Sequence, residues 1–290
     1  MTPGGGPGLQ RPPVAADFSL STREFERIRE LVREHTGIAL SAAKRELVYG
    51  RLSRRLRALR LTGFGEYIEL LEGGAGPEIE EFINAVTTNL TSFFREPHHF
   101  DYLAREFLPK RVASDAGTRR LRIWCCAAST GEEPYSIAMV LREAAQQLAG
   151  WDVKLLATDL DSAALAAGEA GIFGGERVRS LNPSRLGRFF ERGTGAQTGR
   201  ARANAELRAL ITFRQLNLMH EWPMRGPFDA IFCRNVVIYF DKATQRTLFE
   251  RMAALQRAGD LLFLGHSESL YRVSERYELI GRTVYRRLDH

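Results

Sequence analysis

Residues 121–136 read LRIWCCAASTGEEPYS: an apolar run, a turn of small residues, and the start of a helical pattern. The run Leu121–Ala127 contains a β-branched and an aromatic residue, which favours a buried strand. Two acids and Pro134 then open a helix, whose apolar spacing predicts that it extends to Gly150. A strand, a small-residue loop and a helix start in this order are typical of a nucleotide-cofactor site, because backbone N–H groups there face the cofactor.

The same alternation of strand and helix continues along the chain. Three further apolar runs predict strands: Val153–Thr158, Phe228–Cys233 and Asp260–Gly265. The segment Tyr277–Leu288 predicts a hairpin around Gly281. Buried strands alternating with helices indicate an α/β fold with a mainly parallel sheet. Glycines and short polar pieces interrupt the pattern at about 168–210, which predicts an insertion with short strands near 190–215.

The part of the chain before this unit has a helical pattern. Ser21 and Glu24 form a capping box, Gly37 marks the end of that helix, and Ser41 is expected to cap a second one. Another helix is expected from Pro97 to about residue 111. We therefore predict four regions, which are a disordered Gly- and Pro-rich tail at 1–17, a helical N-terminal domain at 18–90, a linker helix region at 91–118, and an α/β domain at 119–290.

Composition excludes several classes of protein. With 44% hydrophobic and 26% charged residues, the chain is neither wholly disordered nor fibrous. Its three cysteines lack metal-ligand spacing, so we expect them to be buried in a reducing compartment. No apolar run reaches the ~20 residues of a membrane span, and no signal peptide is apparent. These features predict a cytoplasmic protein.

The net charge of +6 is unevenly distributed. Residues 41–65 hold basic side chains with Glu46 as the one acid, and residues 172–210 hold a second basic group. The expected helix after Ser41 would carry four basic residues on a water-exposed flank: Lys44, Arg51, Arg54 and Arg55. Two interpretations remain open, an ordinary solvated helix face and a docking surface for an acidic partner.

The cofactor loop has one glycine and lacks the G-x-G-x-x-G pattern, which disfavours a nicotinamide dehydrogenase. Glu132 and Glu133 would repel a pyrophosphate and suit a cationic cofactor, although acids in a first helical turn also complement the helix dipole. Asp159 ends the next strand, where a carboxylate can accept both ribose hydroxyls of an adenosine. An adenosine carrying positive charge describes S-adenosylmethionine (SAM).

The most distinctive segment is residues 87–100, TTNLTSFFREPHHF. With it, the chain resembles the chemotaxis receptor methyltransferases of the CheR family. Four more segments carry the resemblance, in order: Ala128–Ser136, Ala157–Asp161, Phe228–Phe240 and Gly265–Glu268. The resemblance implies an SAM-dependent methyltransferase (Rossmann-like) domain with a small antiparallel β insertion, preceded by an all-α N-terminal domain.

The activity that the resemblance implies is methyl transfer from SAM to glutamate γ-carboxylates of chemoreceptors, which yields methyl esters and S-adenosylhomocysteine. A glutamate, with a pKa of about 4.3, is already an anionic nucleophile at neutral pH, so no general base is required. Arg95 and Tyr239 are implied to lie where substrate and methyl donor meet, with Arg95 positioning the carboxylate. The implied cofactor-binding residues are Asn89, Thr91, Arg95, Glu133, Asp159, Asn217, Leu218, Arg234 and Asn235.

The implied partners are the acidic cytoplasmic helices of chemoreceptors, for which the basic residues after Ser41 would form a dock. In some family members the insertion captures a receptor C-terminal peptide by strand addition. Residues 192–199 resemble that version, whereas the Ala-rich run at 201–205 departs from it, so peptide capture stays open. We expect a monomer that binds no metal and no nucleic acid, does not insert into the membrane, and is recruited to receptor arrays.

Two other functions remain open on sequence alone. One is an SAM-binding adaptor without transfer activity, which intact Arg95 and Tyr239 disfavour. The other is a nucleic-acid methyltransferase, which the missing Pro-Pro-aromatic signature at 228–240 disfavours. We expect His98, His99 and His266 to be structural.

Overall fold

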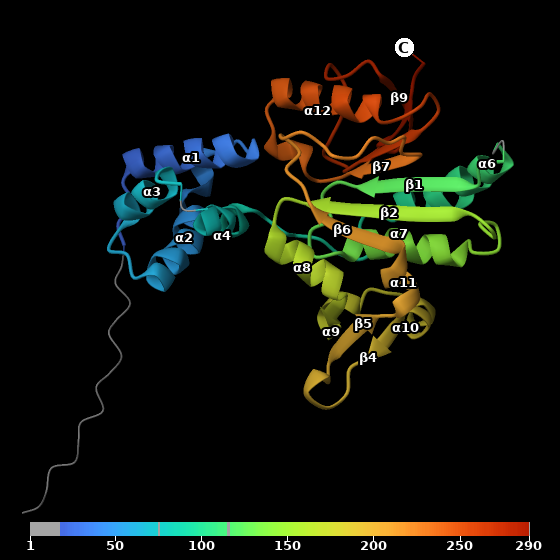
Figure 1. Cartoon of the computed structure of the whole chain (residues 1–290), viewed down its shortest axis with the longest axis horizontal. Coiled ribbons are helices and arrows are strands. Elements are labelled where there is room, and N and C mark those ends of the chain that lie inside the picture. The colour runs from blue at the N-terminus through green and yellow to red at the C-terminus, as the bar shows by residue number, and fades with distance from the viewer. Residues whose placement is uncertain (1–17, 75, 115–116, 290) are drawn as a thin grey trace, which may run out of the picture.

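A computed structural model describes residues 18–74, 76–114 and 117–289, so the expected tail at 1–17 lies outside the described residues. The N-terminal part is a helical module made of α1 (Thr22–Thr36), α2 (Arg45–Leu59), α3 (Phe64–Glu72) and α4 (Gly76–Val86) (Figure 1). The capping box is confirmed, since Ser21 and Glu24 bond each other's backbone N–H groups. Gly37 ends α1 with a φ of 74°, in the left-handed region that favours glycine.

The start of the second helix differs from the prediction. A 3-10 turn, Ala42–Lys44, follows Ser41, whose side chain makes no capping hydrogen bond, and α2 begins only at Arg45. The apolar stripe of α2 is buried as predicted, with Val48, Leu52 and Leu56 fully covered in a core shared by the four helices. The module therefore has a hydrophobic core of its own.

The second part of the chain is built on a seven-stranded sheet with the order β6-β2-β1-β7-β8-β10-β9. Its parallel strands are β1 (Arg120–Cys125), β2 (Asp152–Asp159), β6 (Ile211–Gln215), β7 (Ala230–Cys233) and β8 (Leu261–Leu264). The hairpin of β9 (Tyr277–Gly281) and β10 (Val284–Arg287) adds two antiparallel strands. The predicted mainly parallel sheet and terminal hairpin are confirmed.

Helices cover both faces of this sheet, as β1 illustrates. Its side chains alternate, so that Leu121 and Ile123 face one core while Trp124 faces the other. The first core includes α7 (Glu132–Glu143) and the helical stretch of α5 (His98–Tyr102), a π-helical turn (Leu103–Phe107) and α6 (Leu108–Ala113). The second core includes α12 (Lys242–Ala254). α7 ends earlier than predicted, and turns at 144–150 follow it.

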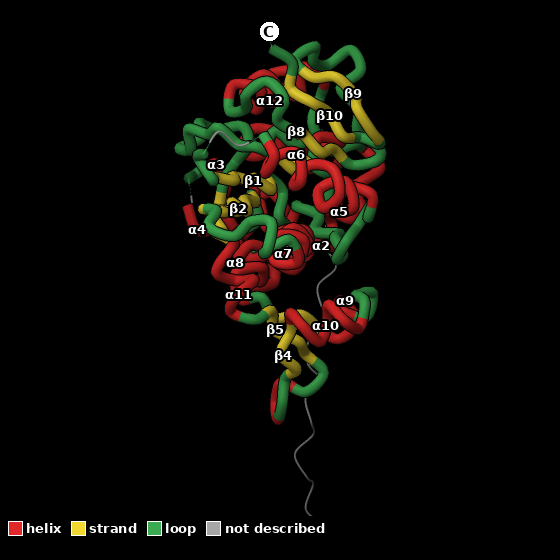
Figure 2. Tube along the Cα trace, turned by 90° about the vertical axis from the view of Figure 1, so that its right-hand side faces the viewer, coloured by secondary structure: helices red, strands yellow, loops and turns green. Residues whose placement is uncertain are grey.

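The insertion forms a separate antiparallel sheet with the order β3-β5-β4. Its elements are β3 (Ile172–Gly174), α9 (Gly175–Val178), α10 (Pro183–Phe189), β4 (Phe190–Arg192), β5 (Arg200–Ala203) and α11 (Ala205–Leu210). Both views show it projecting from the α/β body beyond α8 (Ser162–Ala170) and α11 (Figures 1 and 2). The predicted small antiparallel insertion is confirmed, while the exact domain bounds stay predictions.

Packing explains the Ala-rich run that departed from expectation. In the ladder, Ala201 lies opposite Phe173 and Ala203 lies opposite Phe190. All four side chains are buried, so small residues on β5 make room for the two aromatic rings on its neighbours. The three cysteines are also buried and free, as predicted. Across the described residues, no helix is long and apolar enough to cross a membrane.

Candidate active site

The carboxyl ends of β1, β2 and β7 open onto one pocket of about 860 Å³, its open mouth included. Every residue predicted from the sequence to bind cofactor or glutamate lines it: Asn89, Thr91, Arg95, Glu133, Asp159, Asn217, Leu218, Arg234, Asn235 and Tyr239. Residues separated by more than a hundred positions in the sequence therefore meet at one site.

The loop between β1 and α7 forms the floor of the pocket. Ser129 has a φ of 49° and Gly131 a φ of 100°, so the chain turns sharply before α7 begins. A Cβ at Gly131 would lie 2.9 Å from the Cα of Gly168, a separation that only glycine permits. The Ser129 N–H donates to Asp159 Oδ2 at 2.7 Å, which ties the loop to the end of β2.

Asp159 is the acid that the sequence placed at a strand end. It is half-buried, and its carboxylate accepts the N–H groups of Ser129 and Asp161 at 2.7 and 2.9 Å. Burial raises the pKa of Asp159 to about 6, although these backbone hydrogen bonds oppose the rise. Each carboxylate oxygen has two lone pairs, so both can still accept a hydroxyl from the pocket.

Arg234 lies at the centre of a buried charge network. Its side chain is fully buried, forms a close ion pair with Glu133, lies 3.4 Å from Glu96 and donates to the carbonyl of Arg95. Burial alone would raise the pKa of Glu96, but the hydrogen bond with His266 and the charge of Arg234 outweigh it and lower that pKa to about 2. Glu96 therefore stays ionised and holds three loops together.

This network corrects the argument made from the two acids at the start of α7. Glu133 lines the pocket, but Arg234 neutralises it. Glu132 is outside the set of pocket residues, is 1% exposed and pairs with Arg177. The expectation that these acids by themselves attract a cationic cofactor is wrong, because arginines distant in sequence cancel both charges.

Arg95 and Tyr239 offer unused polar groups to the pocket. Arg95 donates to the carbonyl of Leu90 at 2.9 Å, and within the described ranges its guanidinium has no carboxylate partner. Tyr239, in the 3-10 turn Val237–Tyr239, is half-buried, and its hydroxyl has no hydrogen-bond partner among the residues that the structure describes.

Sequence reasoning missed two contributors to the site. Glu268 is 4% exposed and accepts four backbone N–H groups, from Asn235, Val236, Val237 and Gly265, at 2.6–2.9 Å. It thereby fixes the loop that carries Asn235 and Tyr239. The motif at 265–268 contained this acid, but a motif match does not reveal what the acid bonds.

The other contributor is the helical module. Thr36, the last residue of α1, and Ile38, just beyond it, line the pocket, and the Ala39 N–H donates to the carbonyl of Tyr239 at 2.9 Å. Asn217 donates from its amide to the carbonyl of His35 at 2.7 Å. Nothing in the local sequence signals that this segment forms a pocket wall.

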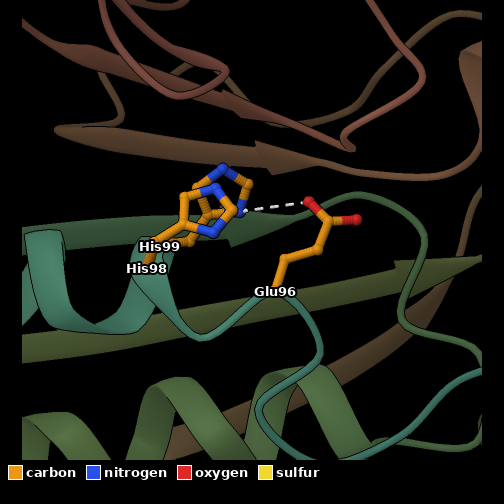
Figure 3. A group of neighbouring side chains, drawn as sticks. All are labelled: Glu96, His98 and His99. Carbon is orange, nitrogen blue, oxygen red and sulfur yellow. Dashed lines mark ion pairs between the residues drawn. The ribbon is translucent and has the colours of Figure 1, made fainter.

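Glu96, His98 and His99 bring ligand-type atoms within 4.8 Å of one another (Figure 3). Arg234 lies beside the same carboxylate, which opposes a cation there. Burial and the charges of Arg234 and His98 lower the pKa of His99 to about 3, so the ring is neutral. Both rings have Nε2 3.2 Å from the carbonyl of Arg282, and they tie α5 to the β9–β10 hairpin.

The four basic residues predicted to lie on an exposed flank divide into two kinds. Arg51 donates to the carbonyls of Ala85 and Val86, at the end of α4, and Arg55 pairs with Glu78 and Glu81 of the same helix. The expectation that Arg51 and Arg55 lie exposed is therefore wrong, because α4 packs against this flank of α2. Lys44 and Arg54 are exposed as expected.

Comparisons with known proteins agree with this site. The family described as CheR methyltransferase, SAM binding domain, matches residues 89–286, and its all-alpha domain matches residues 23–87. The chain is 47% identical to the chemotaxis protein methyltransferase of Klebsiella aerogenes, over 94% of this chain and 92% of that protein. Identity is 48% to chemotaxis protein methyltransferase 2 of Pseudomonas aeruginosa, over 93% and 94%. It is 45% to the Escherichia coli protein, over 92% of each.

Proposed function

Because the chain belongs to the CheR methyltransferase family, we propose that its pocket binds SAM along the Asp159 edge and receives a receptor glutamate at Arg95. The chain is an SAM-dependent chemotaxis protein methyltransferase, which methylates chemoreceptor glutamates. The roles of individual residues below are our proposal.

The residues of the pocket fit the cofactor. Asp159 has lone pairs free for two ribose hydroxyls, and buried Leu218 and Phe240 provide apolar surface for an adenine ring. Glu133 and Arg234 already pair with each other, so they present a fixed dipole rather than a net charge to the amino-acid end of SAM. When bound, SAM supplies a methyl group on a sulfonium, and its transfer to a carboxylate oxygen leaves S-adenosylhomocysteine.

The observation that carries the assignment is the guanidinium of Arg95, which lines this pocket and has no carboxylate partner among the described residues. A planar guanidinium can hold a carboxylate through two parallel hydrogen bonds, which fixes the direction of its oxygens. Arg95 thus positions the glutamate, whose charge already makes it a nucleophile. The free hydroxyl of Tyr239 can donate to the same carboxylate, so the two residues together define one orientation.

Receptor helices approach, in this proposal, over the exposed surface of the 3-10 turn Ala42–Lys44 and α2. Lys44 of the turn and Arg54 of α2 are exposed and form no ion pair among the described residues, and they steer acidic helices toward the pocket mouth. The strands β3 and β4 are the two edges of the small sheet, and either edge can pair with an extended receptor peptide. Such contacts would recruit the protein to receptor arrays.

The test is methyl transfer from labelled SAM to purified cytoplasmic fragments of chemoreceptors. We expect base-labile label on the receptor, and Arg95→Ala should lower kcat/KM for the receptor about 10- to 150-fold, in line with the loss of a charge-assisted contact of ~1.5–3 kcal/mol. Arg105→Ala, at an exposed arginine of the same region, is the matched control and should retain activity.

Three results would contradict the proposal. Tight cofactor binding without transfer to any receptor would indicate the adaptor. Label in RNA or DNA would indicate a nucleic-acid methyltransferase. Full receptor methylation by Arg95→Ala would refute the role of Arg95 in positioning the glutamate.

A further inference from the structure

One arginine of the insertion reaches into the loop that forms the pocket floor. Arg177 belongs to α9, and its Nη1 donates to Thr130 Oγ1 at 2.6 Å and forms a close ion pair with Glu132. Thr130 Oγ1 in turn donates to Glu132 Oε2 at 2.7 Å. The three side chains therefore form a closed network between the small sheet and the start of α7.

Burial makes Glu132 depend on this network. Glu132 is 1% exposed, and within the described residues Arg177 is the only cation that pairs with it. An ionised carboxylate that has left water needs such a partner, because an unpaired buried charge is strongly destabilising. The Arg177 side chain stays half-exposed, so it reaches the buried Glu132 from the solvent side.

The loop that Arg177 contacts is one that needs external support. Ser129 and Gly131, on either side of Thr130, both have positive φ angles, of 49° and 100°. A non-glycine residue in that region stores strain and persists only where its surroundings fix it. Asp159 fixes the loop at Ser129, and Arg177 fixes it at Thr130. Ser129 and Glu133, which flank the Arg177 contacts, line the pocket.

Separate contacts hold the insertion against the α/β body. Phe173 of β3 packs against Phe93 and Tyr135, with ring centroids 4.9 and 5.5 Å apart. Arg185 of α10 forms two hydrogen bonds with Glu143, at 2.7 and 2.8 Å. These contacts do not involve Arg177, so its removal should leave the insertion in place and affect the loop selectively.

We propose that Arg177 is a positioning residue for the cofactor, through which the insertion holds residues 129–133 in their binding conformation. The small sheet is then part of the cofactor site as well as an appendage. The inference rests on the proposed function in one respect, that SAM binds in this pocket.

The experiment compares Arg177→Ala with Arg177→Lys and Arg179→Ala. Arg179 is the matched control, because Arg179→Ala loses the same charge two residues away, but in the described structure Arg179, just beyond α9, pairs only with Glu176 of that helix. We expect Arg177→Ala to raise the Kd for S-adenosylhomocysteine and the KM for SAM about two- to thirtyfold, a range typical of coupling through a neighbouring residue. The kcat at saturating SAM should change little, Arg177→Lys should recover part of the affinity, and Arg179→Ala should match the wild type.

A purely structural role predicts a lower melting temperature with an unchanged Kd, and that result would overturn the proposal. Thr130→Val provides a second test, since it removes the hydroxyl while preserving shape and the ion pair. It should raise the Kd in the wild-type background and add little to Arg177→Ala. If Arg177→Ala does not fold, an unchanged Kd for Thr130→Val decides against the proposal. Failure of the proposed function looks different, because then the wild type itself would not bind the cofactor.

Discussion

Asp159 should make cofactor binding depend on pH around pH 6. Burial raises its pKa to about 6, above the ordinary value of 3.8. The carboxylate is therefore mostly ionised above pH ~6 and mostly protonated below it. Only the ionised form offers every oxygen lone pair to the ribose hydroxyls, so affinity should fall as the pH is lowered.

The size of the effect comes from the ionised fraction. With a pKa of about 6, Asp159 is about 97% ionised at pH ~7.5 and about 9% ionised at pH ~5. If only the ionised form binds, the Kd for cofactor rises about tenfold across this interval. Two neighbouring groups do not contribute, because the pKa of Glu96 is about 2 and that of His99 about 3, so neither titrates there.

Isothermal titration calorimetry with S-adenosylhomocysteine between pH ~5 and ~8 measures this dependence. Asp159→Asn is the control, since it keeps the shape of the side chain but cannot ionise. It should bind more weakly at neutral pH, and the ratio of the two Kd values cancels any titration of the ligand itself. A ratio that stays constant across the interval would refute the role given to Asp159.

Two further predictions concern the charge network and the basic residues of α2. Arg234→Met leaves two carboxylates without their buried partner, so it should lower the free energy of unfolding by about 3–5 kcal/mol and the melting temperature by about 6–20 °C in calorimetry. Adding Glu133→Gln should restore part of this stability, and no recovery would contradict the pairing of Arg234 with Glu133. Lys44→Glu with Arg54→Glu should raise the KM for receptor about two- to tenfold, less so at high salt, and leave the cofactor Kd unchanged. Arg55→Ala should instead lower the melting temperature, because Arg55 pairs with Glu78 inside the helical module. If Arg55→Ala raised the KM for receptor as much as the Lys44→Glu and Arg54→Glu pair does, the distinction between structural and docking residues would be refuted.

Local patterns predicted most of the elements and those pocket residues that lie in sequence motifs. The capping box at Ser21, the apolar runs of β1 and β2 and the terminal hairpin depend on residues close in sequence, so their chemistry can be read along the chain. Several residues that line the pocket lie at or just beyond the carboxyl ends of β1, β2, β6 and β7, which parallel strands bring to one edge of a sheet: Glu133, Asp159, Asn217 and Arg234.

Which charges remain free could not be read in the same way. Arg51 and Arg55 looked like an exposed surface until α4 was seen to pack against them, and Glu132 and Glu133 looked like free acids until Arg177 and Arg234 were seen to pair with them. The wall contributed by Thr36 and Ile38 likewise depends on how the helical module docks. Periodicity and motifs predict the fold, the family and the pocket residues that lie in motifs, because these signals are local. Tertiary packing sets which of those residues are unpaired and available for binding, because ion pairing depends on distances between segments that are remote in sequence.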